Sequence, residues 1–317
     1  MKFFITGGAG FIGSHFVDYL LKKKHKVIVY DNLILGSKKN LSKNFQNKNF
    51  KFIKGDILNF QKLKSSMKNV NVVIHLAANS DIIKSSNDPI IEIKNGTMGT
   101  SNVLEAMRFN NIKEIIFTSS NVVYGEVEKL PIKENYGPLF PISFYGASKL
   151  ACEALISAYC HNYKFKSWIF RFANVVGSRT THGIIFDFFR KVKKNKNELL
   201  VLGDGNQSKP YIHVDDIVRA AYYIYYNIKK EVNFFNLGTD GFTSVKKIAK
   251  EFLKFMNLKD TKIIYKGGKR GWPGDVSRVR LDNNKIKKTG YKFYISKSDK
   301  AFLLGMKQAI KHLKGLV

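Results

Sequence analysis

The sequence predicts an α/β fold in which a doubly wound parallel sheet is followed by a smaller C-terminal domain. Two observations support this class. Up to residue 172, short apolar runs typical of buried strands alternate with stretches whose apolar residues recur at helical spacing. The small and polar residues that suit a ligand come directly after these runs, at the carboxyl ends of strands, where open α/β sheets bind their ligands.

The stretch TGGAGFIG joins the first expected strand, residues 2–5, to a helix that starts at Phe11. Gly7, Gly10 and Gly13 have the spacing that allows a tight turn, a close approach to a pyrophosphate and a helix packed closely on the sheet. The free N–H groups and the positive dipole end of the helix would face the phosphates. We therefore predict a dinucleotide site on a Rossmann-type sheet, in preference to an ordinary glycine-rich turn.

The second expected strand, residues 26–30, ends at Asp31, about twenty residues beyond the glycines. An acidic residue at this place would hold the ribose hydroxyls of the adenosine. Its charge would repel a 2′-phosphate, so the sequence favours NAD over NADP as the cofactor.

The other elements of the sheet follow in order along the chain. A polar loop is expected over residues 32–49 and a helix over 90–110. Further strands are expected at residues 50–53, 72–76, 114–118 and 167–172. The strand at 114–118 leads into Ser119 and Ser120, which places two hydroxyl groups at a strand end.

Tyr145 and Lys149 begin a further expected helix, which runs to about residue 163. Their spacing of four residues places both side chains on one helical face. Four other Tyr–Lys pairs have this spacing, and we interpret those lysines as solvated. Because this helix follows the loop after Ser119 and Ser120, we expect a serine, Tyr145 and Lys149 to converge beside the cofactor.

Beyond residue 172 the alternation of strand and helix becomes less regular. We expect helices there at residues 184–194, 244–256 and 298–314, and a short strand at 199–202. The segment 211–238, with a strand at 211–214, is expected to return to the sheet. The predicted dinucleotide-binding domain is therefore 1–172 with 211–238, and the predicted substrate domain is 173–210 with 239–317.

Composition restricts the partners and the setting. The net charge is +30, but only 8 of the 54 basic residues are arginines and the lysines are dispersed, so no nucleic-acid partner is predicted. The charge should still attract anionic substrates. No signal peptide or membrane-spanning run is apparent, so a cytoplasmic enzyme is expected. Cys152 and Cys160 lie too far apart on one helix for a disulfide, and no metal site is expected.

A series of motifs along nearly the whole chain resembles one family. They are TGGAGFIGSH, DNL, GDI, HLAA, NGTMGTSNVLEA, SSNVVYG, YGASKLACE, RFANVVG, LGDGNQ, YIHVDD and RGWPGD, in this order. The chain is similar to the extended short-chain dehydrogenases/reductases that act on nucleotide sugars, and most similar to the UDP-galactose 4-epimerase branch. The resemblance implies bound NAD, a second domain that grips the nucleoside diphosphate, and a homodimer built from the helices near 92–110 and 145–163.

The resemblance also implies roles for individual residues in cofactor binding and catalysis. Cofactor contacts are implied for Gly7, Gly10, Phe11, Ile12, Gly13, Asp31, Asn32, Asp56, Ile57, Leu76, Ala77, Ala78 and Lys149. Ser120, Tyr145 and Lys149 match the catalytic triad of the family, and Ser119 is the next candidate for the serine.

For the substrate, the resemblance implies contacts from Asn174, Lys209 and Arg270. Lys209 stands where the family usually has arginine, and Pro210 where it often has aspartate. The spacing from Arg270 to the following Gly-Asp also departs from the common pattern. The partner is expected to be a nucleotide-diphosphate sugar linked to UDP, GDP or CDP.

Asn121 and Val122 bear on the kind of reaction. Sugar 4,6-dehydratases of this family carry an acidic pair at this place, because eliminating water from the sugar needs an extra acid and base. Val122 can serve as neither, so we predict oxidation at C4 without elimination. The favoured function is a nucleotide-sugar 4-epimerase, and the alternative is a net C4 dehydrogenase in surface-polysaccharide synthesis. A 4,6-dehydratase and a non-catalytic NAD-binding regulator are less favoured.

Overall fold

The computed structural model describes residues 1–79, 82–268, 274, 276 and 278–315. Its centre is a seven-stranded sheet in the order β11-β6-β5-β4-β1-β2-β3, in which every pair of neighbours is parallel. The strands are β1 (Lys2–Thr6), β2 (Lys26–Asp31), β3 (Phe50–Lys54), β4 (Val72–His75), β5 (Glu114–Ser120), β6 (Lys166–Phe172) and β11 (Val232–Leu237). This confirms the predicted doubly wound α/β class.

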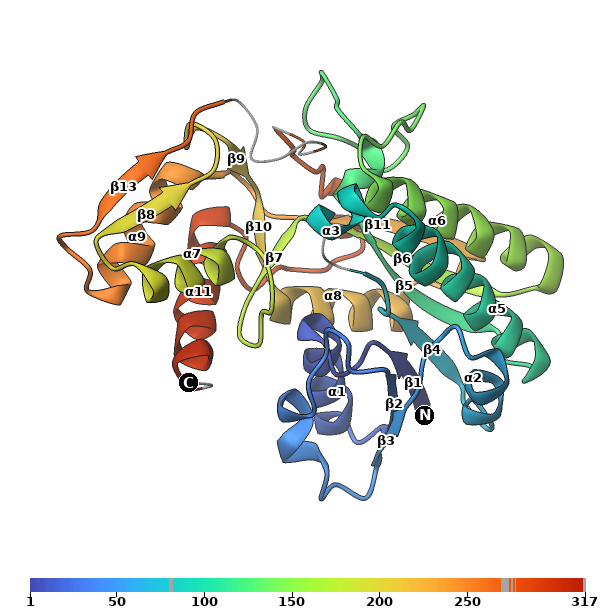
Figure 1. Cartoon of the computed structure of the whole chain (residues 1–317). Coiled ribbons are helices and arrows are strands. Elements are labelled where there is room, and N and C mark those ends of the chain that lie inside the picture. The colour runs from blue at the N-terminus through green and yellow to red at the C-terminus, as the bar shows by residue number, and fades with distance from the viewer. Residues whose placement is uncertain (80–81, 269–273, 275, 277, 316–317) are drawn as a thin grey trace.

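Alternate residues of the buried strands pack into two different cores. In β1, Phe3 and Ile5 join the core on one face, and Phe4 joins the core on the other. The first core contains helices α1 (Phe11–Lys22) and α8 (Val214–Asn227). The second contains α2 (Phe60–Ser66), α5 (Gly99–Phe109) and α6 (Phe144–Tyr163), so helices cover both faces of the sheet (Figure 1).

The helix expected over residues 90–110 is not a continuous α-helix. It consists of α4 (Ile90–Glu92), a π-helical turn η2 (Ile93–Met98) and α5. Where the helix widens, Ser148 Oγ of α6 donates a hydrogen bond to the carbonyl oxygen of Glu92, 2.9 Å away. A helical pattern of apolar residues does not reveal this widening, because one extra residue shifts the period only locally.

A second group of elements lies to one side of the sheet (Figure 1) and has its own hydrophobic core. Its helices are α7 (Ile184–Lys194), α9 (Val245–Met256) and α11 (Ser298–Gly315). Its strands are β7 (Asn174–Val176), β8 (Glu198–Val201), β9 (Ser208–Lys209), β10 (Tyr211–His213), β12 (Thr243–Ser244) and β13 (Lys262–Tyr265). They form three two-stranded sheets, β10-β7, β12-β9 and β13-β8. We call this group the second lobe.

One expectation about the sheet is wrong. The strand expected at 211–214 does not return to the main sheet, because β10 pairs in parallel with β7 instead. The chain returns through α8 and β11, and β11 pairs with β6 at the edge of the sheet. The short elements missed from sequence include α2, α3 (Ile82–Asn87), α10 (Asn284–Lys287) and the 3₁₀ turns η1 (Lys38–Asn44) and η3 (Asn121–Tyr124).

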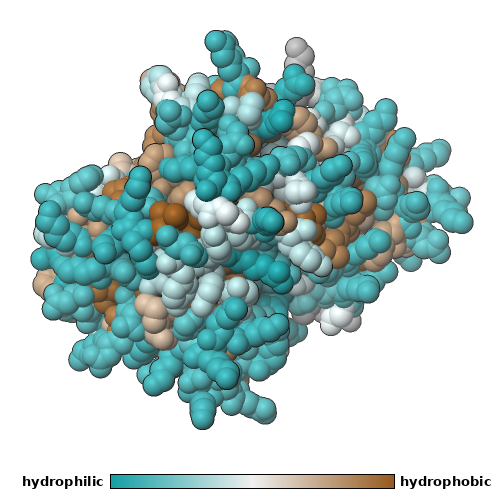
Figure 2. All heavy atoms as spheres, turned by 180° about the vertical axis from the view of Figure 1, so that it is seen from behind, coloured by the Kyte–Doolittle hydropathy of each residue, from teal (hydrophilic) through white to brown (hydrophobic). Residues whose placement is uncertain are grey.

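Hydrophilic side chains cover most of the face shown in Figure 2, with hydrophobic ones in small patches between them. Cys152 and Cys160 are both buried and free, as their spacing on one helix predicted. No helix within the described residues combines the length and the apolar character needed to cross a membrane.

Candidate active site

The glycine-rich turn lies between β1 and α1 and has little room for side chains. Gly7 has a φ of +70°, and a Cβ there would lie 2.7 Å from the backbone nitrogen of Ala77. A Cβ on Gly13 would lie 2.2 Å from the carbonyl oxygen of Gly7. Helix α1 follows Gly10 without a side-chain cap and without an acidic residue in its first turn, so its N-terminal N–H groups remain available to an anion.

Asp31 is held beside this turn by backbone donors. Its Oδ2 accepts a hydrogen bond from the Ala9 N–H at 2.9 Å, and its Oδ1 accepts one from the Leu33 N–H at 2.8 Å. Burial raises the pKa of the Asp31 carboxyl, and these two hydrogen bonds oppose that rise. A buried carboxylate next to an uncapped helix N-terminus fits a ribose and a pyrophosphate, the two groups that NAD presents together.

The other expected cofactor residues line the same edge of the sheet. Asn32 Nδ2 donates to Asp56 Oδ2 at 2.9 Å, and the Tyr30 hydroxyl donates to the carbonyl oxygen of Asp56 at 3.0 Å. Ile57 is buried. Leu76, Ala77 and Ala78 follow β4 and stay partly exposed. The residues present therefore fit NAD.

The structure brings Tyr145 and Lys149 to the end of β5. Lys149 Nζ donates to the carbonyl oxygen of Thr118 at 2.8 Å and lies 5.7 Å from the centre of the Tyr145 ring. Ser120 is the last residue of β5, two positions beyond Thr118, and its Oγ accepts a hydrogen bond from the Val122 N–H at 3.4 Å. Helix α6 starts correctly for this meeting because the Ser143 side chain caps it, accepting from the Gly146 N–H.

Burial shifts the pKa values of Tyr145 and Lys149 in the directions that disfavour their charged forms, the phenolate and the ammonium ion. It raises the pKa of Tyr145, and the negative charge of Glu92 adds to this rise. It lowers the pKa of Lys149, with Cys152, Glu92 and Glu153 acting in the opposite direction. Tyr145 therefore needs a nearby positive charge before it can act as a phenolate.

Ser119 and Ser120 are separated by their contacts. Ser119 Oγ donates to Glu153 Oε1 at 2.5 Å. Glu153 also accepts two hydrogen bonds from Arg171, at 3.0 Å from Nε and at 2.6 Å from Nη2, and both residues are buried. Because the Ser119 hydroxyl is hydrogen-bonded to Glu153, Ser120 is the better candidate for the catalytic serine. We call Ser119, Lys149, Glu153 and Arg171 the strand-end cluster.

Sequence reasoning missed Glu153, although a signal was present. Tyr145, Lys149 and Glu153 are spaced four residues apart and so lie on one face of α6. An acidic residue on a face that points at a strand end indicates a buried partner. That partner, Arg171 on β6, could not be identified without knowing that β5 and β6 are neighbours.

Two of the expected substrate residues, Asn174 and Lys209, lie in the second lobe. Asn174 begins β7, and its backbone N–H donates to the carbonyl oxygen of Pro210 at 3.2 Å. Lys209 lies in β9, one position before Pro210, so the structure brings the positions 174 and 209 to one region. Arg270 lies outside the described residues.

Together the fold and the site define a dinucleotide-dependent α/β enzyme with a tyrosine–lysine pair at a strand end. A family model described as the NAD dependent epimerase/dehydratase family matches residues 3–238, and the chain belongs to this family. Its cofactor is NAD, and it is a nucleotide-sugar enzyme.

Relatives of known or assigned activity match nearly the whole chain. The chain is 35% identical over 316 residues to a putative UDP-glucose 4-epimerase of Methanocaldococcus jannaschii, covering 98% of this chain and 97% of that protein. The crystal structure of the UDP-glucose 4-epimerase of Thermotoga maritima with UDP-glucose is similar, with a TM-score of 0.87, 30% identity, and coverage of 100% and 99%. So is the UDP-glucuronic acid 4-epimerase of Bacillus cereus in complex with UDP-glucuronic acid and NAD, with a TM-score of 0.88, 28% identity, and full coverage of both chains, 100%.

Proposed function

We propose that this chain is an NAD-dependent 4-epimerase of a UDP-linked sugar. The observation that carries the proposal is the meeting of Tyr145 and Lys149 at the end of β5, next to Ser120 and without an acidic side chain at residues 121 and 122. This arrangement suits the removal and return of hydrogen at one carbon. It lacks the second acid–base pair that an elimination of water needs. The UDP link is proposed because the relatives named above act on or bind UDP-sugars.

Tyr145 serves as the general base that takes the proton of the C4 hydroxyl, and Ser120 donates a hydrogen bond to the same oxygen. When bound, NAD supplies the hydride acceptor and a positively charged ring. The free phenol has a pKa of about 10, and burial in this chain raises it further, so the ammonium group of Lys149 must stabilise the phenolate. Lys149 has the position for this, since its Nζ is held by Thr118 near the Tyr145 ring.

In this proposal the sheet lobe binds the cofactor and the second lobe binds the substrate. Residues of the glycine-rich turn, Asp31 and the end of β4 bind the cofactor. Asn174 and Lys209 bind the nucleoside diphosphate from the side of the second lobe, and Arg270 is a further proposed ligand of it. The proximity of residue 174 to the 209–210 segment supports one common site for the first two.

We also propose a homodimer through α5 and α6. Phe109, Phe144 and Tyr163 on these helices are exposed although they are large and aromatic, and a partner helix would cover them. Light scattering at micromolar concentration should give the mass of two chains, and the mass of one chain would contradict this.

UDP-glucose with deuterium at C4 tests the reaction. An epimerase returns the label to C4 of UDP-galactose, with unchanged mass and no lasting NADH absorbance. An accumulating keto-sugar without the label would favour the net C4 dehydrogenase, and loss of water would contradict the argument from Val122. GDP- and CDP-glucose run in parallel test the choice of nucleotide.

A further inference from the structure

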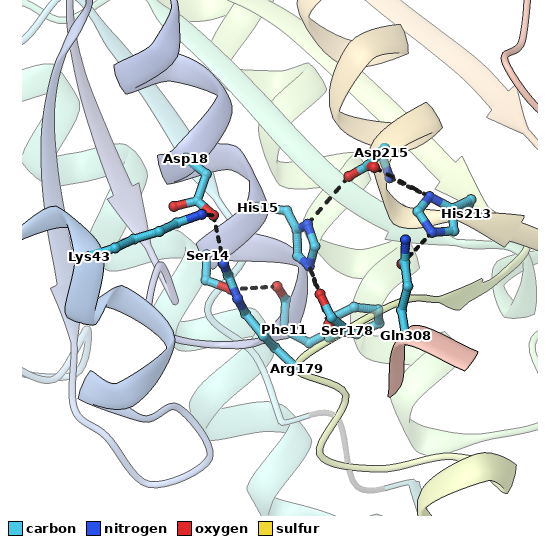
Figure 3. A network of polar contacts seen from close by, with 10 residues as sticks. All are labelled: Phe11, Ser14, His15, Asp18, Lys43, Ser178, Arg179, His213, Asp215 and Gln308. Carbon is cyan, nitrogen blue, oxygen red and sulfur yellow. Dashed lines mark hydrogen bonds and ion pairs between the residues drawn. The ribbon is translucent and has the colours of Figure 1, made fainter. Parts of the chain in front are cut away.

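Arg179 connects the second lobe to the cofactor side of the sheet. It follows β7, the first strand of the second lobe, and its guanidinium group reaches back to α1 (Figure 3). Its Nη2 donates to Asp18 Oδ2 at 2.7 Å. The side chains are 14% and 20% exposed, so the contact is mostly shielded from water.

Asp18 also accepts hydrogen bonds from the turn η1. Lys43 Nζ lies 2.9 Å from Asp18 Oδ2, and Asn44 Nδ2 donates to Asp18 Oδ1 at 2.7 Å. Burial alone would raise the pKa of Asp18, but Asn44, Lys43 and Arg179 outweigh burial and hold it below its ordinary value. One carboxylate therefore holds η1 and Arg179 at the same time.

Hydrogen bonds also connect η1, and Ser37 at its start, to the candidate cofactor site. The Ser37 N–H and Asn40 Nδ2 both donate to the carbonyl oxygen of Ala9, the second at 2.9 Å. The N–H of the same Ala9 donates to Asp31. The contacts thus run from the ribose-binding candidate Asp31 through Ala9 and η1 to Asp18.

A second residue of α1, His15, contacts the segment that carries Arg179. His15 Nε2 lies 3.2 Å from the carbonyl oxygen of Ser178, and His15 Nδ1 lies 3.4 Å from Asp215 Oδ1 at the start of α8 (Figure 3). His15 and Asp18 are three residues apart and share a helical face. We call His15, Asp18, Ser178, Arg179 and Asp215 the seam cluster.

Arg179 has two features that are unfavourable in themselves. Its φ is +65°, a backbone conformation that residues other than glycine seldom adopt. Its Nη1 is buried and finds no hydrogen-bond partner among the residues that the structure describes. Such features persist where the surrounding structure enforces them, and they are frequent at functional sites.

We propose that Arg179 is a positioning residue that couples the adenosine side of the cofactor site to nucleotide binding by the second lobe. This rests on the function proposed above. NAD bound at Asp31 stabilises η1, η1 stabilises Asp18, and Asp18 holds Arg179 and with it the segment 178–183 that leads into α7. By linkage, a nucleoside diphosphate that binds the second lobe more tightly when NAD is bound must raise the affinity for NAD by the same factor. We expect this gain in affinity to appear as slower release of NAD.

The test uses purified holoenzyme and UDP, a nucleotide that cannot react. Two quantities are measured, the affinity for UDP by calorimetry and the rate of NAD release with and without UDP. Asp18→Asn and Arg179→Gln should each weaken UDP binding roughly tenfold and abolish the slowing of NAD release by UDP. The double variant should lose little more than the worse single variant, because both changes break one contact.

Two further variants make the result specific. Lys191→Gln also removes one positive charge from the second lobe, where Lys191 pairs with Asp187 at 2.6 Å, and should leave both quantities unchanged. Arg179→Lys keeps the charge but not the forked geometry, and it should show part of the defect. Thermal unfolding confirms that each variant is folded.

Additive losses in the double variant, or NAD release and UDP affinity equal to those of the parent, would overturn the coupling. If the parent retains NAD but does not bind UDP, the UDP-sugar function fails instead. In that case the rates of NAD release alone decide, because loss of the Asp18 contact must still speed NAD release in both single variants.

Discussion

Arg171 and Arg179 lie eight residues apart in the sequence, and each forms an ion pair with a carboxylate, but the two pairs are built differently. Arg171 lies inside the sheet lobe and binds Glu153 through two nitrogens, with both side chains less than a tenth exposed, 7% and 8%. Arg179 crosses between the lobes and contacts Asp18 through one nitrogen. Their comparison contrasts an ion pair inside one lobe with an ion pair between the two lobes.

The remaining contacts of Arg171 complete its environment. Its Nη1 donates to the carbonyl oxygen of Glu134 at 3.3 Å, and the guanidinium group lies 4.7 Å from the centre of the Tyr124 ring. Burial alone would lower the pKa of Arg171, but Glu153 reverses this and raises it. A buried ion pair with all its groups engaged holds one geometry, as the proton transfer proposed at the end of β5 requires.

The seam cluster has a less complete set of contacts. Within the described part of the chain, Arg179 Nη1 has no hydrogen-bond partner, and Asp215 is half exposed, at 50%. Rearranging such contacts on ligand binding costs less free energy than breaking a fully engaged pair. We therefore expect the strand-end cluster to keep one geometry and the seam cluster to adjust when a ligand binds.

The largest expected effect concerns the chemistry at the strand end. Tyr145→Phe removes the general base and should lower kcat by roughly 10²- to 10⁴-fold. The affinity for UDP should stay that of the parent, because Tyr145 has no part in the seam cluster. The measurement is turnover of UDP-glucose beside calorimetry with UDP, and near-normal turnover would remove Tyr145 from the mechanism.

The second effect compares the two ion pairs directly in the free energy of unfolding. Glu153→Ala leaves the Arg171 charge buried and unpaired, which typically costs about 3–5 kcal/mol. Asp18→Ala should cost less free energy of unfolding. The charges it leaves unpaired are more exposed to water than Arg171, at 62% for Lys43 and 14% for Arg179 against 7%. Urea denaturation of both variants measures the two losses, and equal losses would contradict the distinction between the pairs.

Ser119, which belongs to the strand-end cluster, and its neighbour Ser120 provide a smaller and more selective comparison. Ser120→Ala should lower kcat by less than Tyr145→Phe, because a hydrogen bond is lost and the base remains. Ser119→Ala should act mainly on stability, by about 1.5–3 kcal/mol for a hydrogen bond to a charged group. Steady-state kinetics and urea denaturation separate the two, and a larger loss of kcat in Ser119→Ala would reverse the assignment of the catalytic serine.

Local patterns were sufficient to predict most strands of the main sheet and most of the longer helices, and to select the pair Tyr145 and Lys149. Apolar periodicity defines each strand, and a spacing of four defines a helical face, so both can be read from neighbouring residues. The pairs Glu153–Arg171 and Asp18–Arg179 join residues 18 and 161 positions apart, and only the folded chain brings them together.

The error over β10 has the same origin. Residues 211–213 have the apolar character of a buried strand, but the sequence does not say which strand lies beside them. Their partner is β7, a strand of the second lobe that follows β6 of the main sheet along the chain. The proposed roles of Asn174 and Lys209 depend on this pairing as well, since it brings their two segments together.

The smallest predicted effect is the pH dependence that Asp18 gives to stability. Its folded-state pKa is lowered, because Asn44, Lys43 and Arg179 outweigh its burial. Its contribution is therefore fully present above the unfolded pKa of about 3.9, and it is lost as the pH falls through the folded pKa.

Comparison with Asp18→Asn isolates this contribution, because asparagine does not titrate. The difference in free energy of unfolding between the parent and the variant should be on the order of 1 kcal/mol at pH 6 and should shrink as the pH falls from 4 to below 3. Urea denaturation at a series of pH values measures it. A difference that does not change with pH would show that Arg179 and its neighbours do not stabilise the Asp18 carboxylate, and the seam would then lack the charged contact on which its coupling depends.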